Sequence, residues 1–241
     1  MIEWLKHSPR EMPMIEIGEH RLPIVLRRVH HARRLTLRLA PDGSEVRVSM
    51  PRWGRTGEAL AFARSRTAWL ARQLDSLPPP NAPRPGGTIA FRGDPLRIEH
   101  GANAPRTVRQ QDDAILIGGP VDTLSPRLRR WLEGEARQIL ADDLAHYCAR
   151  AGVPLAKLAL SNARRRWGSC GSNGTIRLNW RLVMAPNEIR RSVVAHEVAH
   201  LIHFDHSPRF HALLGKIFEG DIGTANRWLK SEGRGLYAVF G

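Results

Sequence analysis

The segment V-A-H-E-V-A-H-L-I-H-F-D-H, residues 194–206, constrains the structure of this chain more than any other. It contains the pattern H-E-x-x-H, and His206 follows ten residues after the first histidine, His196. On a helix, residues four apart lie one above the other, so His196 and His200 can present two imidazoles to one cation. Glu197 projects beside that cation, where a general base for a metal-bound water is needed. The pattern therefore predicts a zinc site on a helix, with Glu197 as its catalytic residue.

The helix that carries these side chains is expected to be mostly buried, because its remaining residues are apolar. Valine, alanine and leucine occupy positions 193, 194, 198, 199 and 201. The alternative is a core helix that carries three histidines on one side by chance. Because the H-E-x-x-H pattern is rare in an unrelated chain, the metal site is favoured.

A third ligand has to come from a later turn of the chain. His203 continues the same helix face, but on a regular helix it lies about 10.5 Å along the axis from His196. Two nitrogens on one tetrahedral zinc are only about 3.4 Å apart, given Zn–N bonds near 2.05 Å. The chain must therefore turn after His203, and Ser207 and Pro208 predict the N-cap and first residue of the next helix. This favours His206 as the third ligand and makes His203 a helix-end residue beside the site.

Other side chains are weaker candidates for the same site. Glu219 lies 19 residues beyond His200, close to the spacing at which other zinc peptidases place a glutamate ligand, and is the rival of His206. Asp205 is a candidate for the acceptor that orients an imidazole ligand. A second group that stabilises the oxyanion is expected, but the sequence does not identify it. The candidates for contact with the substrate or its oxyanion are Asn179, His203 and Tyr237.

The composition limits the class of protein. A chain of 241 residues with 42% hydrophobic and 25% charged residues is typical of a soluble globular protein with one large or two small domains. No apolar run approaches the length of a membrane span, and the first six residues lack the apolar core of a secretory signal. Only Cys148 and Cys170 are present, so neither a disulfide framework nor a cysteine zinc site is expected. These features predict a cytoplasmic protein without a membrane partner.

The formal net charge of +14 raises the question of nucleic-acid binding. The charge is evenly spread, because residues 1–120 carry 19 Lys and Arg against 12 Asp and Glu, and residues 121–241 carry 18 against 11. No basic block stands out beyond Arg164, Arg165 and Arg166. A dedicated nucleic-acid surface is therefore the weaker expectation.

The first half of the chain reads as β-strands with one helix. Polar and apolar residues alternate over residues 34–39 and again over residues 45–50, on either side of a turn at residues 41–44. This pattern predicts a β-hairpin. Thr56 can cap a helix that runs through about Leu77. A proline-rich connector follows over residues 78–87. Four short alternating runs then predict a small antiparallel meander, at residues 88–92, 96–100, 107–110 and 114–117.

The second half predicts helices around a small sheet. Ser125 and Pro126 open a long helix that ends near Ala151, before Gly152 and Pro154. Strands are predicted at residues 155–161 and at residues 175–183, directly before the histidine helix. The free edge of the second strand could pair with an extended peptide. A core strand with solvated arginines is an equally good reading.

Three segments resemble the YgjP-like zinc metallopeptidases, which are similar to the SprT-like proteases that act on proteins crosslinked to DNA. They are R-R-R-W-G-S-C at residues 164–170, G-T-I-R-L-N-W-R-L at residues 174–182, and H-E-V-A-H-L-I-H-F-D-H-S-P-R-F at residues 196–210. The resemblance covers most of the chain. It implies His196, His200 and His206 as zinc ligands and Glu197 as the catalytic residue. A metzincin assignment is not carried over, because those enzymes have glycine at the position of His203 and a Met-turn.

The resemblance implies an α+β fold. A zincin-like metallopeptidase domain, with a small mixed sheet, a long backing helix and the H-E-x-x-H helix, is expected over residues 121–241. A β-rich region with one helix at residues 56–77 is expected over residues 1–120.

The expected function is zinc-dependent hydrolysis of peptide bonds in a peptide or protein substrate. The alternatives are a nucleic-acid-associated protein with a structural zinc site, a SprT-like protease that acts on DNA-bound proteins, and hydrolysis of an amide that is not a peptide. The structural zinc site would need a complete set of protein ligands, whereas a catalytic site keeps one position open.

Overall fold

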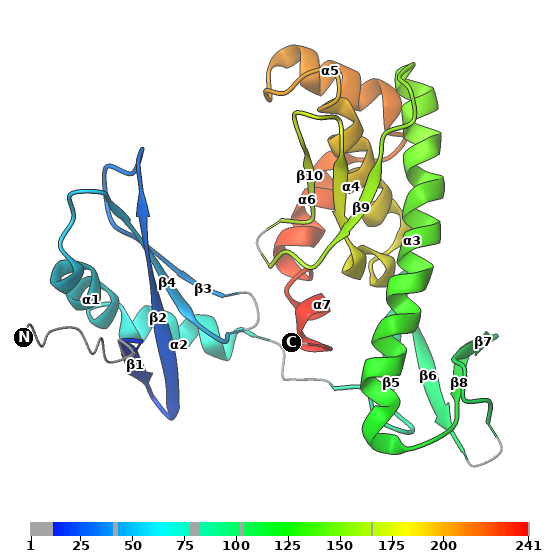
Figure 1. Cartoon of the computed structure of the whole chain (residues 1–241), viewed down its shortest axis with the longest axis horizontal. Helices are drawn as coiled ribbons and strands as arrows, with labels where there is room; N and C mark the ends of the chain where they lie inside the picture. The colour runs from blue at the N-terminus through cyan, green and yellow to red at the C-terminus, as the bar shows by residue number, and fades with distance from the viewer. Residues whose placement is uncertain (1–11, 41–42, 78–81, 102–103, 165, 241) are drawn as a thin grey trace, which may run out of the picture. The chain divides into compact units, whose positions relative to one another are not determined.

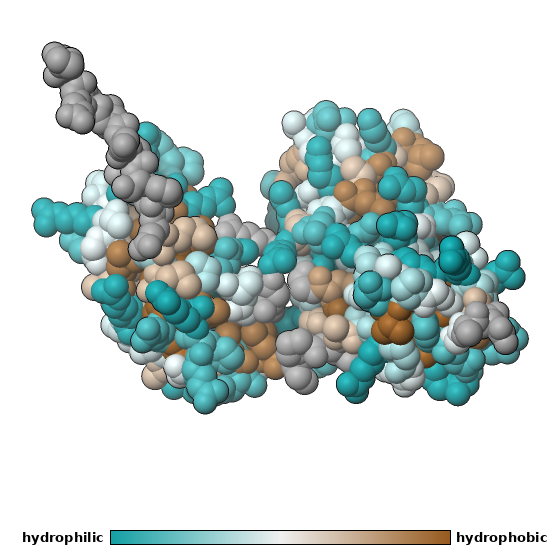
Figure 2. Space-filling view, turned by 60° about the horizontal axis from the view of Figure 1, so that its bottom comes forward, coloured by the Kyte–Doolittle hydropathy of each residue, from teal (hydrophilic) through white to brown (hydrophobic). Residues whose placement is uncertain are grey.

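The structure is a computed structural model that describes residues 12–40, 43–77, 82–101, 104–164 and 166–240 (Figure 1). The first six residues, residues 41–42 of the predicted hairpin turn, residues 78–81 of the connector and Arg165 lie outside these ranges. On the face of the molecule in Figure 2, hydrophobic residues form scattered patches among hydrophilic ones. Within the ranges given above, no helix combines the length and the apolar composition needed to cross a membrane.

The chain forms two compact units, Met1–Leu77 and Pro78–Gly241. The boundary falls at the proline-rich connector and not between residues 120 and 121, where the sequence placed it. The physical reason is a shared core. Apolar residues of the sheet at residues 88–117, among them Ile98 and Ile115, belong to the same buried cluster as those of the long helix that follows.

The first unit contains a four-stranded sheet. Its strands are β1 (Met14–Ile17), β2 (His20–Val29), β3 (Thr36–Leu39) and β4 (Val46–Pro51), in the order β1-β2-β4-β3. β3 pairs antiparallel with β4, which confirms the predicted hairpin. β2 pairs with β4 in parallel, so that Val29 lies opposite Pro51 and both strands finish at the same end of the sheet.

The predicted helix at residues 56–77 is two helices, α1 (Thr56–Arg64) and α2 (Thr67–Asp75). α1 ends at Arg64. The backbone N–H of its C-cap, Ser65, donates to the carbonyl of Ala61, and Arg66 leaves the helical conformation with φ −112° and ψ 16°. The break lets α1 contact β2 and β4 while α2 contacts β1 and β3. Both helices thereby cover the apolar face of one sheet.

The second unit begins with another four-stranded sheet. Its strands are β5 (Thr88–Phe91), β6 (Asp94–His100), β7 (Arg109–Gln111) and β8 (Ala114–Ile117), in the order β5-β6-β8-β7. Because β6 and β8 are parallel, the predicted antiparallel meander is wrong. β6 and β8, which carry the buried Leu96, Ile98 and Ile115, lie at the centre, and the exposed β7 lies at an edge. The order and strand directions are those of the β1–β4 sheet.

The long helix expected behind the site is α3 (Leu124–Ala151), which follows the 3₁₀ helix η1 (Val121–Thr123). It ends at Ala151, as predicted, and the C-cap Gly152 has a left-handed φ of 69° that glycine adopts without strain. A stripe of buried residues runs along it: Leu128, Leu132, Ala136, Leu140 and Leu144. α3 contacts the helix that carries the histidines.

A third sheet has the order β10-β11-β9, from β9 (Leu158–Ser161), β10 (Gly168–Cys170) and β11 (Ile176–Asn179). The strand predicted over residues 175–183 is shorter than expected, because Trp180–Met184 form the 3₁₀ helix η2. β11 is the central strand, so the proposed pairing of a peptide with its free edge is wrong. β10 is an edge strand, and it contacts the histidine helix.

Four helices complete the second unit: α4 (Asn187–Ala199), α5 (Pro208–Ile217), α6 (Ile222–Ser231) and α7 (Gly235–Ala238). α4 is almost entirely buried and contacts α3, α5, α6 and β10. Ser207 caps α5 and Pro208 is its first residue, as predicted. The structure is therefore an α+β fold with several small sheets, as the sequence predicts.

Candidate metal centre

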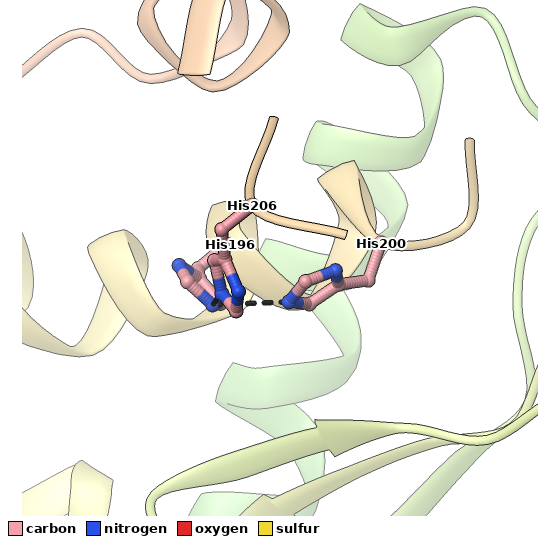
Figure 3. Close-up of side chains that lie close together, drawn as sticks. All are labelled: His196, His200 and His206. Atoms are coloured by element: carbon pink, nitrogen blue, oxygen red, sulfur yellow. Dashed lines mark hydrogen bonds between the residues drawn. The ribbon is translucent and has the colours of Figure 1, made fainter. Parts of the chain in front are cut away.

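Three histidines converge at the end of α4. The Nε2 atom of His196 lies 3.2 Å from that of His200 and 3.3 Å from that of His206. Figure 3 shows the three imidazole rings pointing toward one another. Among the residues that the structure describes, these three form a group whose possible ligand atoms all lie within 4.8 Å of one another. The spacing fits about 3.4 Å between two nitrogens on one tetrahedral zinc.

A tight turn after α4 brings His206 back to the helix. α4 ends at Ala199, and the backbone N–H groups of Leu201 and Ile202 donate to carbonyls only three residues earlier. The turn thus begins before His203, earlier than the sequence indicates. This places His206, ten residues after His196, beside the first two histidines.

Phe210 supports all three imidazoles from behind. Its side chain lies on α5 and is completely buried. The centroid of its ring lies 5.0 Å from that of His196, 4.6 Å from that of His200 and 4.9 Å from that of His206. Phe210 was not predicted as part of the site. Its position three residues after the Ser207 cap, and therefore on the first turn of α5, was the available signal.

His203 acts on the site through its backbone. Its carbonyl oxygen lies 2.9 Å from the Nδ1 atom of His200. When Nδ1 carries the proton, this N–H donates to the carbonyl, and the unprotonated Nε2 is free to bind a metal. Asp205, the candidate for this role, is fully exposed, and a hydrogen bond from the Ser207 side chain lowers its pKa. Asp205 is therefore bonded within the turn, and among the described residues no hydrogen bond joins it to the three histidines.

Burial keeps the imidazole of His196 neutral. Burial, together with the charges of His200 and His206, lowers the pKa of His196 to about 4. Its imidazole is therefore neutral at pH 7, which is the protonation state that binds a metal.

Glu197 is buried next to the three histidines and points toward β10. Only 6% of it is exposed, and burial raises its pKa to about 7, against the opposing effect of a hydrogen bond from the Cys170 backbone. A cavity of about 210 Å³ opens beside it, lined by residues of α4, α6, β10 and the segment just before β10, among them Val193, Ile222 and Trp167. Glu197 and His196 thus both line a space that can admit a ligand.

Glu219, the rival third ligand, contacts Tyr147 and Arg191 instead of the histidines. The hydroxyl of Tyr147 donates to its carboxylate at 2.9 Å, and Arg191 forms an ion pair with it at 2.6 Å. These contacts join the end of α5 to α3 and α4. Glu219 is not part of the histidine group.

Asn179 and Tyr237 do not line the cavity beside Glu197. Asn179 is completely buried, and its amide nitrogen donates to the carbonyl of Ala163 and the hydroxyl of Tyr237. Its amide oxygen accepts from the backbone of Arg181. Tyr237 is 4% exposed and donates to Ala163 as well. The two side chains hold η2 and α7 in place.

Cys170 is partly buried on β10. Burial, and to a lesser degree the nearby Glu197, raise the pKa of its thiol. It is therefore protonated at neutral pH, which favours an inert thiol over a redox sensor.

Comparison with known proteins relates this chain to metallopeptidases. The family model described as YgjP-like, metallopeptidase domain, matches residues 33–232. A solved structure, the metallopeptidase zymogen abylysin of Pyrococcus abyssi, is similar with 23% identity and a TM-score of 0.36, over 39% of this chain and 96% of that chain. No curated protein matches the chain.

Proposed function

This chain belongs to the YgjP-like metallopeptidase family, and we propose that it is a zinc peptidase in which Glu197 is the general base. The observation that supports the proposal most strongly is the convergence of His196, His200 and His206 beside the buried Glu197. The family implies a metal ion. A set of three imidazoles suits zinc better than magnesium or calcium, which prefer oxygen ligands.

The bound metal would be held by the Nε2 atoms of the three histidines. Zinc in such a site supplies Lewis acidity, which polarises a carbonyl and lowers the pKa of a water from about 15.7 toward about 7. Glu197 accepts the proton of the attacking water and returns it to the leaving amine. The backbone N–H of Cys170 holds the carboxylate in place while Phe210 holds the imidazoles.

The substrate pairs as an extended strand with β10 and not with β11. Backbone hydrogen bonds join Trp167 to Asn179 and Gly171 to Thr175, and the register between them pairs Ser169 with Arg177. In an antiparallel pair, the residues between two hydrogen-bonded positions direct their N–H and C=O groups away from the partner strand. The backbone groups of Gly168 and Cys170 therefore face away from β11. One of these, the Cys170 N–H, already reaches Glu197. A peptide on this edge would pass directly over the base.

The cavity beside Glu197 accepts one side chain of that peptide. Its volume of about 210 Å³ and its lining by Trp167, Val193, Ile222 and Leu229 suit an apolar side chain of medium size. Arg166, Ser192 and Asn226 add polar groups to the wall, and His196 and Glu197 line it on the side of the proposed metal. We therefore expect cleavage next to aliphatic residues such as leucine or methionine.

The alternative of a structural zinc site is less well supported. A structural zinc has four protein ligands, whereas a catalytic one keeps a position open. Within the described part of the chain, no fourth histidine, cysteine or carboxylate joins the three histidines. The buried acid next to the histidines also has no purpose in a structural site. An amide substrate that is not a peptide would use the same site and is distinguished only by assay.

The test is cleavage of a peptide library by the whole 241-residue chain, read by mass spectrometry. The protein is treated with a chelator, and zinc or magnesium is then returned. We expect cleavage that is lost with the chelator, restored by zinc alone, and concentrated next to aliphatic residues. Cleavage that survives removal of all metal would refute the proposal.

A further inference from the structure

Six arginines gather at one end of the β1–β4 sheet in the first unit. β2 and β4 are parallel and finish together, and β3 begins at the same end because it is antiparallel to β4 (Figure 1). Two segments separated in sequence, residues 27–36 and 50–57, therefore meet there. Together they contain Arg27, Arg28, Arg33, Arg34, Arg52 and Arg55, and no acidic residue. We call this the arginine end of the sheet.

The acidic residues of the sheet lie toward the opposite end. Glu19 is in the turn between β1 and β2, and Glu45 directly precedes β4. The described acid nearest in sequence to the arginine end is Glu58, in the first turn of α1. The sheet thus has a charge difference between its ends, which orients a polyanion toward one of them.

One of the six arginines has a structural role, because it holds together the two segments that carry the others. Arg28 donates to the backbone carbonyls of Arg52 and Gly54 at 2.8 Å and 2.6 Å, so it fixes the loop after β4 to the end of β2. The other five are exposed, and none of them forms an ion pair with any residue that the structure describes. Their charges are available to a partner.

The fixed loop presents an aromatic side chain among these charges. Trp53 lies between Arg52 and Arg55 in sequence and is 78% exposed, so its indole ring is accessible to a partner. An exposed indole flanked by guanidinium groups combines a surface for stacking with donors for phosphate.

We propose that the arginine end binds single-stranded nucleic acid, a function beyond the proposed peptidase. All basic residues in the described part of this unit are arginine, whose planar guanidinium matches phosphate oxygens with paired hydrogen bonds. Trp53 favours a single strand over a duplex, because only an unpaired base offers its face for stacking. A membrane surface would need a broader apolar area to insert, and an acidic protein offers no base to Trp53.

The test uses the whole 241-residue chain and a labelled oligodeoxythymidylate of about 20 nucleotides, longer than the site of a small domain. Binding is followed by fluorescence anisotropy at several salt concentrations, with a duplex of equal length and phosphatidylserine vesicles as competitors. We expect the single strand to bind more tightly than the duplex, and the affinity to fall as salt rises. Binding to the vesicles in preference to the oligonucleotide, or no binding at low salt, would overturn the proposal.

Matched variants locate the binding site. Arg33→Gln, Arg34→Gln and Arg52→Gln together remove three charges from the arginine end, and we expect at least about tenfold weaker binding with a reduced salt dependence. Trp53→Ala should weaken binding by about five- to a hundredfold. The control removes three exposed arginines elsewhere in the same unit and should change the affinity by less than about twofold. Its substitutions are Arg21→Gln, Arg64→Gln and Arg72→Gln.

Equal losses in the two triple variants would mean that only net charge matters and would refute a defined site. Circular dichroism of each variant confirms that it is folded. Cleavage of short peptides is measured on the same proteins and should be unchanged, so that a failure of nucleic-acid binding is distinguished from a failure of the peptidase proposal.

Discussion

Gly168 on β10 lies so close to Glu197 on α4 that a β-carbon at residue 168 would be 2.5 Å from the Oε1 atom of the glutamate. No ordinary van der Waals contact is that short, so a larger residue would displace the carboxylate. The close approach places the edge strand and the proposed base side by side. Glycine at this position is therefore part of the geometry of the site.

Gly168→Ala should reduce peptide cleavage by about a hundredfold or more, because a displaced base loses its alignment with the attacking water. Zinc content should remain that of the parent, since the three histidines are untouched. Gly134→Ala on α3 is the matched control. A β-carbon there meets nothing within 4 Å, so activity should be kept and the free energy of unfolding should rise by about 0.5–1 kcal/mol. Parent activity in Gly168→Ala would contradict the account.

Glu197→Gln should retain zinc and lose turnover by about 10²- to 10⁴-fold, because the amide has the shape of the carboxylate but cannot accept the proton. Zinc content is measured by mass spectrometry of the metal, and turnover on the best peptide of the library. His200→Ala should lose both zinc and activity. If Glu197→Gln cleaves at the parent rate with zinc bound, the general base is another group.

The buried carboxyl of Glu197 predicts a pH-dependent stability once the metal is removed by a chelator. Its pKa is raised from the ordinary 4.5 to about 7 by burial. Between these values the folded protein keeps a proton that the unfolded chain has lost, so the free energy of unfolding falls as pH rises through the window. The full effect is about 3 kcal/mol and is reached above the folded-state pKa.

Glu197→Gln has no proton to lose at this position. In urea titrations with chelator present, the stability of the variant relative to the parent should therefore increase from about pH 4.5 to about pH 7. The comparison removes contributions from the groups that the two proteins share. A constant difference across this range would show that the carboxyl is not buried as described.

The choice of third ligand is tested by two alanine variants. His206→Ala should lose zinc, because only two imidazoles remain. Glu219→Ala should keep zinc and lose about 1 kcal/mol of stability, since it removes a half-exposed acceptor of Tyr147 and Arg191. Zinc loss in the Glu219 variant alone would reverse the assignment.

The histidine group was predictable because its determinants are local. His196 and His200 are four residues apart on a helix, and the Ser207 cap forces the intervening turn that returns His206. The supports of the group were not predictable in the same way. The His203 carbonyl acts through its backbone, and Gly168 acts through a contact between segments that are distant in the chain. Neither leaves a pattern in the surrounding residues.

In the sheets, too, local pairings were predictable and pairings between distant segments were not. The hairpin of β3 and β4 was predicted, because a short turn between two alternating segments makes the pairing local. The parallel pairs β2–β4 and β6–β8 were not predicted, since each joins strands across an intervening strand. The break between α1 and α2 was missed because apolar residues continue on both sides of Ser65 and Arg66. The arginine end depends on one of these non-local pairs, so it has no counterpart as a basic block in the sequence.

The coordination sphere of the metal tests the central claim most directly. X-ray absorption spectroscopy of the zinc-loaded protein, with anomalous diffraction to place the ion, gives the ligands and their distances. The account predicts three imidazole nitrogens, from His196, His200 and His206, at about 2.0–2.1 Å and one further position taken by solvent. A fourth protein ligand in that position, or an ion held away from these three histidines, would contradict it.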